Sequence, residues 1–226
     1  TVLDLVGRRT EAVEVAYQGI EDARQAGLEA VYGNFLRGNV SESLYLLGRW
    51  TEARELAARA LDWLPTGVIF LTAAVQLAMI EIETEAGERA ARYLGRTTLE
   101  FDAVPEPQLA GSYYLASASF ALWRGDVADA ARSVERGWAA VRETEEWVLA
   151  ARMAAMVARV DSAIGAEAHE RRRLAPLATA RGRTAEVVRT AAGLVRASGA
   201  PSLAGSRRIA EAYLATARAF QRRLEG

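Results

Sequence analysis

The chain has 226 residues, of which about half are apolar, and alanine is abundant among them. Its 28 basic and 29 acidic residues nearly cancel, so no broad positive field favours nucleic acid or an anionic membrane. The basic residues are all arginine, and the absence of cysteine excludes disulfides and thiolate metal sites. We therefore expect a helical protein of the cytoplasm, in which this segment contacts neither DNA nor a membrane directly.

A short stretch recurs near the start of the chain. GRRTEA at residues 7–12 returns as GRWTEA at residues 48–53, and this separation falls in the range of helical repeats. Each copy is predicted to close one helix at its glycine, in the left-handed conformation, and to begin another. Thr10 and Thr51 are the expected caps of the helices that follow.

Helices are predicted on both sides of the second copy. Residues 52–65 carry small and apolar side chains along one helical face, and residues 67–80 form the longest predominantly apolar stretch. The second stretch falls short of the ~20 residues that span a bilayer, so it is predicted to be a buried helix.

Further turns are predicted around Gly125 and, in a divergent copy, around Gly87. Beyond residue 142 the pattern decays. A helix is expected at 146–163, ended by Gly165. One long helix or two, interrupted by Pro176 and Gly182, are expected at 167–198, and a last helix is expected to be capped near Ser202.

The spacing of these glycines, alanines and prolines resembles the tetratricopeptide repeat. The resemblance implies an all-α fold, a right-handed α-solenoid of antiparallel helix pairs with about ten helices. We expect one domain over residues 1–226, with regular repeats at about 7–142 and divergent helices at 143–226. Stacking makes a continuous core that a lone helix pair lacks. The residues assigned to the repeat are Gly7, Ala12, Gly48, Ala53, Ala60, Pro65, Gly125 and Ala130.

The same resemblance implies a groove lined by the first helix of each pair. The positions expected to face a ligand or partner are Phe35, Asn39, Glu42 and Tyr45 in one pair and Ser112, Leu115, Ser119 and Trp123 in another. The family's basic clamp for peptide carboxylates is missing there, because the chain has no lysine and Glu42 has the opposite charge.

No catalytic motif stands out. The chain has no nucleotide-binding loop, no GxSxG and no HExxH, and His169 has no second imidazole with which to bind a metal. We expect no enzyme, cofactor or metal in this segment. The arginines at 171–173, 181 and 183 are interpreted as a solvated, internally paired face, with phosphate or an acidic partner as the alternative. Glutamates 81–88 are interpreted as a solvated helix end, with a cation site as the alternative. Most of the five tryptophans are interpreted as core anchors, with a pocket lining as the alternative.

The stretches at residues 44–65 and 147–183 are similar to the helical sensor region of LuxR-type large ATP-binding transcriptional regulators. The similarity implies a non-catalytic module of a longer protein that binds a small-molecule inducer or a protein. ATP would belong only to an upstream domain, and a helix-turn-helix would follow. The alternative is a spacer or dimerisation arm of a cyclase, kinase or similar signalling protein, with a second copy of the chain as its partner. An enzyme is the third hypothesis, supported only by carboxylate pairs and one histidine.

Overall fold

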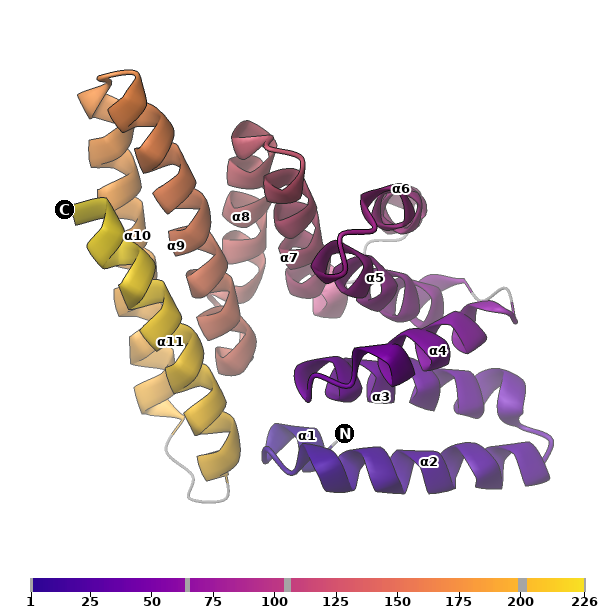
Figure 1. Cartoon of the computed structure of the whole chain (residues 1–226). Helices are drawn as coiled ribbons and strands as arrows, with labels where there is room; N and C mark the ends of the chain where they lie inside the picture. The colour runs from indigo at the N-terminus through magenta and orange to yellow at the C-terminus, as the bar shows by residue number, and fades with distance from the viewer. Residues whose placement is uncertain (1, 64–65, 104–106, 199–202, 226) are drawn as a thin grey trace. The chain divides into compact units, whose positions relative to one another are not determined.

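The computed structural model describes residues 2–63, 66–103, 107–198 and 203–225. In these ranges the chain is helical and contains no β-strand, which confirms the predicted all-α class (Figure 1). The helices cluster into two compact units, Thr1–Leu109 and Ala110–Gly226. Within each unit, helices that are neighbours in sequence pack against one another. No helix in the described ranges is both long and apolar enough to span a bilayer.

The first unit is a stack of short helices and includes one π-helix, η1. The central helices are α3, which contacts α2, α4 and α5, and α5, which also contacts α4 and α6. The elements are α1 (Val2–Leu5), α2 (Arg9–Gln25), η1 (Glu29–Gly33), α3 (Asn34–Leu46), α4 (Trp50–Leu61), α5 (Gly67–Glu83) and α6 (Gly87–Ala103).

Helix α5 is buried on every side over most of its length. All ten residues from Ala73 to Ile82 are buried, and a run of nearly three helical turns has no exposed face. The helix predicted at 67–80 is therefore confirmed.

The recurring sequence forms a recurring turn. Gly7, Gly48 and Gly125 have φ of 79°, 78° and 76°, in the left-handed region that glycine tolerates best. The next residue donates its N–H to a carbonyl five residues back, as Arg49 does to Leu44 at 2.9 Å. This Schellman motif ends the helix and sends the chain directly into the next one.

Thr10 and Thr51 do not cap the helices that follow, so this prediction is wrong. Helices α2 and α4 begin at Arg9 and Trp50, which puts both threonines inside the first turn. The residue before each helix is an arginine that forms a forked ion pair with the glutamate three residues on. Arg49 donates Nε and Nη2 to Glu52 at 2.8 and 2.6 Å, and these bonds lower the pKa of the Glu52 carboxyl. An arginine that forms an ion pair is therefore the N-cap residue of each helix, where a threonine was expected.

The divergent copy turns at Glu85, and the prediction of Gly87 is off by two residues. Glu85 has φ of 58°, and Ala86 donates its N–H to Glu81 at 2.8 Å. Gly87 is the first residue of α6. Five residues after Gly7, Gly48, Glu85 and Gly125 comes an alanine that is at most 2% exposed: Ala12, Ala53, Ala90 and Ala130.

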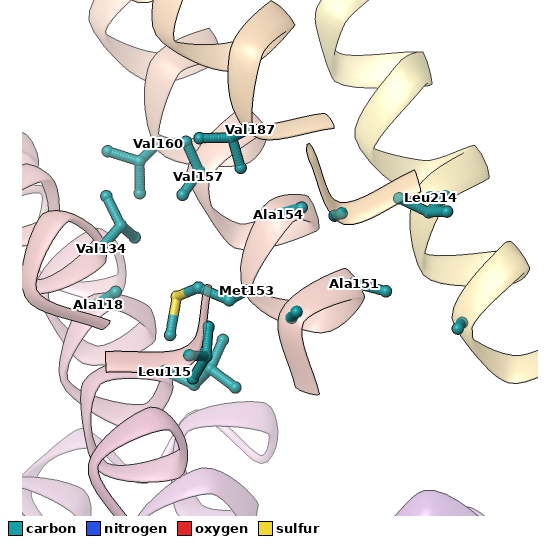
Figure 2. Packing of buried hydrophobic residues seen from close by; sticks show 14 of the residues in the cluster. Leu115, Ala118, Val134, Ala151, Met153, Ala154, Val157, Val160, Val187 and Leu214 are labelled. Atoms are coloured by element: carbon teal, nitrogen blue, oxygen red, sulfur yellow. The ribbon is translucent and has the colours of Figure 1, made fainter. Parts of the chain in front are cut away.

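The second unit is built around the long helix α9 (Figure 1). It contacts α8, α10 and α11. Val157 and Val160 of α9 lie near Val134 of α8 and Val187 of α10, and Leu214 of α11 belongs to the same buried cluster (Figure 2). The elements are α7, which begins at the end of the first unit (Pro107–Trp123), α8 (Val127–Val141), α9 (Trp147–Glu170), α10 (Leu174–Ala197) and α11 (Ala204–Glu225).

Two helices run longer than the sequence predicts. Gly165 does not end α9 but lies buried inside it, where a Cβ would come within 2.5 Å of Leu224 Cδ2. The small size of glycine suits this point, because a larger residue would require the Leu224 side chain of α11 to shift. Pro176 lies in the first turn of α10, which needs no backbone N–H, so the helix runs unbroken to Ala197. Pro65 and Ser202 lie outside the described residues.

The buried alanines are expected to leave no room for a larger side chain. Ala53 is fully buried among Val13, Val40 and Leu44, so Ala53→Leu is expected to lower the free energy of unfolding by ~1 to 3 kcal/mol. Urea denaturation measures this change. Ala91→Leu, on an exposed position of α6, is the control and is expected to change stability by less than ~0.5 kcal/mol. Equal stability of the Ala53→Leu variant and the parent would contradict tight packing.

Substitutions at two left-handed positions are expected to change the free energy of unfolding in opposite directions. Glu85→Gly removes a strained non-glycine residue and is expected to raise the free energy of unfolding by about 1 kcal/mol. Gly48→Ala is expected to lower it by a similar amount. The added Cβ meets no atom within 4 Å, so the cost is conformational. Thermal denaturation of both variants checks the pair, and a Glu85→Gly variant no more stable than the parent would refute the strain.

Candidate functional site

A pocket of about 560 Å³ lies in the second unit, where two inter-helix turns meet. One wall is the turn from α7 to α8, residues 124–128, and the other is the end of α9 with the start of α10, residues 164–176. Both turns are Schellman motifs, closed at Gly125 and at Arg172, whose φ is 53°. The volume falls within the range of small-molecule sites, ~300 to 1,000 Å³.

The rim of the pocket carries three arginines and two carboxylates. Arg124 lies over the Phe120 ring, 4.9 Å from its centroid, and forms ion pairs with Asp126 at 3.8 Å and with Asp129 at 3.4 Å. The second carboxylate of the rim, Glu167, lies 3.3 Å from a guanidinium nitrogen of the second arginine, Arg171.

The third arginine, Arg173, is exposed and has no side-chain hydrogen bond or ion pair within the part of the chain that the structure describes. The rim therefore offers one guanidinium that is not neutralised by a neighbour.

The remaining lining is apolar. It mixes partly buried side chains with exposed ones and is contributed by α8, α9 and α10: Val127, Ala128, Ala131, Ile164, Ala168 and Pro176. An apolar wall beside convergent polar groups is the usual composition of a ligand site.

The basic cluster that the sequence analysis singled out is divided among three roles. Arg171 and Arg173 line the pocket, while Arg172 between them forms the left-handed turn. Arg181 donates Nε to the Leu224 carbonyl at 2.6 Å, near the end of α11. Arg183 pairs with buried Asp161, so the cluster is not one solvated face.

The predicted groove residues fall into two groups, one in each unit. On α3, Phe35 is 48% exposed, and Asn39, Glu42 and Tyr45 are partly exposed.

On α7, Leu115 and Ser119 are buried, at 1% and 5% exposure. Ser112 is partly buried, and Trp123 is 47% exposed. A ligand on the surface of α7 reaches only the last two of these.

Three of the five tryptophans are not core anchors. Trp50, Trp63 and Trp123 are 38%, 53% and 47% exposed, whereas Trp138 and Trp147 pack against the core of the second unit. Trp123 stacks on Phe120 with ring centroids 5.9 Å apart. Its ring therefore packs against a residue of its own helix.

Two buried carboxylates were missed by the sequence analysis. Glu81, expected in a solvated helix end, is 2% exposed and accepts Nε of Arg54 at 3.0 Å and of Arg89 at 2.9 Å. Asp161 is fully buried and accepts the Thr184 hydroxyl at 2.7 Å as well as Arg183 Nε at 3.1 Å. No local signal marked either acid as buried, because Glu83 and Glu85 follow Glu81 and Arg159 lies two residues before Asp161.

His169 is exposed, one residue before the end of α9. Among the residues that the structure describes, no three or more His, Asp or Glu side chains gather in a way that could hold a metal ion.

The ion pair of buried Asp161 with Arg183 predicts which of two variants is the less stable. Arg183→Ala leaves a fully buried carboxylate without its cation and is expected to cost ~3 to 5 kcal/mol of unfolding free energy. Asp161→Asn keeps the partner of the Thr184 hydroxyl and leaves a partly exposed arginine that water can reach, so it is expected to cost less. Urea denaturation compares both with Arg189→Ala, an exposed change on α10. The reverse order would contradict this assignment of the buried charge.

Comparison with models of protein families finds no match to this chain, and comparison with curated proteins finds none either.

Proposed function

We propose that the chain is a non-catalytic sensor module that binds a small molecule in the pocket between α8, α9 and α10. The observation that carries this proposal is the pocket itself, about 560 Å³ with an apolar wall and a charged rim. Two turns that lie far apart in the sequence contribute to it, so a bound molecule would bridge α8 and the start of α10. Holding both turns couples the ligand to the relative position of the helices.

We propose further that the module belongs to a LuxR-type transcriptional regulator of the cytoplasm and does not itself touch DNA. The support is the sequence similarity at residues 44–65 and 147–183 and the helix-pair repeat. ATP would bind only to a separate upstream domain. A gene that encodes no nucleotide-binding loop before this region and no helix-turn-helix after it would contradict this parentage.

The alternative, a dimerisation arm in another signalling protein, has one observation in its favour. Leu28, Val31, Tyr32 and Phe35 follow helical spacing through η1 into α3, and each is 48–58% exposed. Large exposed apolar side chains in a row are typical of a contact surface. Light scattering of the parent and of Phe35→Glu separates the hypotheses, since a dimer built on this stripe would become monomeric in the variant.

The pocket predicts that ligand binding can be blocked by filling it. A chemically diverse small-molecule library, screened by thermal shift, is expected to contain compounds that raise the Tm. Ala128→Trp puts an indole into the pocket lining and is expected to abolish these shifts. Ala139→Trp, on an exposed position of the same helix, is the matched control and is expected to keep them. No shift in the parent, or shifts that survive Ala128→Trp, would overturn the proposal.

A further inference from the structure

The charges around the pocket define which class of molecule fits it. This step rests on the proposed function, because it assumes that the pocket binds a small molecule. Two of the three rim arginines follow the last residues of helices, Arg124 after α7 and Arg171 after α9, where a cation is favoured by the helix dipole. Both also have carboxylate partners. Their charges are thus compensated within the protein.

Arg173 is different, because it precedes a helix. It occupies the N-cap position of α10 and has no partner in the described ranges of the chain. A cation at a helix N-terminus is unfavourable, since the helix dipole there is also positive. An anion beside Arg173 would relieve this repulsion.

The start of α8 is already capped by a carboxylate that lines the pocket, Asp126, and Asp129 lies in its first turn. Val127 and Ala128, its first two residues, line the pocket. The first N–H groups of a helix have no intrahelical acceptor. The cap residue Asp126 accepts the N–H of Asp129 at 2.9 Å and that of neither Val127 nor Ala128. An anion at this edge of the pocket would face the Asp126 carboxylate, so the favourable place for it is beside Arg173.

Apolar side chains line the pocket between its charged groups. Ile164 and Ala131 are partly buried and Ala168 is buried, and they come from α8 and α9. An inorganic anion would leave these apolar side chains exposed to water, whereas a molecule with an apolar body would cover them.

We propose that the pocket takes a small amphipathic anion, an apolar body that ends in a carboxylate or phosphate group. The anionic group lies against Arg173, and the apolar body covers Ile164 and Ala131. A guanidinium suits both kinds of head group, because its planar fork donates two parallel hydrogen bonds to either.

The test uses four probes on the whole chain, titrated by ligand-observed NMR: octanoate, octyl phosphate, 1-octanol and inorganic phosphate. Octanoate or octyl phosphate is expected to bind, with 1-octanol and inorganic phosphate weaker by on the order of tenfold or more. Arg173→Gln is expected to weaken the binding of octanoate and octyl phosphate by a similar factor. Arg218→Gln, an exposed arginine on α11 outside the pocket, is expected to leave them unchanged.

Several results would overturn the inference. Equal binding of 1-octanol removes the role of the charge, and equal binding of inorganic phosphate removes the role of the apolar body. Unchanged binding by Arg173→Gln, or retained binding by Ala128→Trp, places the anion elsewhere. If the anionic probes fail while neutral or cationic library compounds still give shifts that Ala128→Trp abolishes, only this inference is wrong. If no compound of any class binds, the proposed function fails with it.

Discussion

A single left-handed residue at the end of a helix is the constraint on which the packing of both units depends. At Gly48 and Gly125 the chain leaves one helix and enters the next with one residue between the turn and the new helix. The Schellman hydrogen bond fixes that interval. The alanine five residues on is therefore brought against the preceding helix, as Ala53 is against Leu44 and Ala130 against Leu115. A larger side chain there would force the two helices apart.

The sequence contains enough information for this part of the fold, and the reason is local. Gly48 and Ala53 act through backbone conformation and side-chain size, which can be read from a repeated motif. Glu85 escaped notice because a non-glycine residue takes the left-handed conformation when the packing on both sides requires it. The prediction that Gly165 ends a helix is wrong for the opposite reason. The small size of this residue serves contact with Leu224, which lies far along the chain, and the helix continues through it.

The candidate site was less accessible to sequence reasoning, because it depends on which turns meet. The basic stretch at 171–173 stood out by composition, but nothing local indicates that it lies across from Gly125 and Asp126. That proximity follows from the packing of α8 against α9. The Asp161–Arg183 pair likewise joins two helices, and only their packed arrangement distinguishes it from the exposed pairs such as Arg49–Glu52.

The continuous burial of α5 has a consequence for cooperativity. Stacked repeats commonly open from their ends, one unit at a time, because each contacts only its neighbours. Helix α5 departs from that behaviour, since α3, α4 and α6 all contact it and ten successive residues have no water-facing side. Losing any one of these neighbours exposes part of a strongly apolar surface to water. The amide protons of α3 to α6 should accordingly exchange with solvent through one shared opening event, while those of α2 exchange by smaller and more frequent ones.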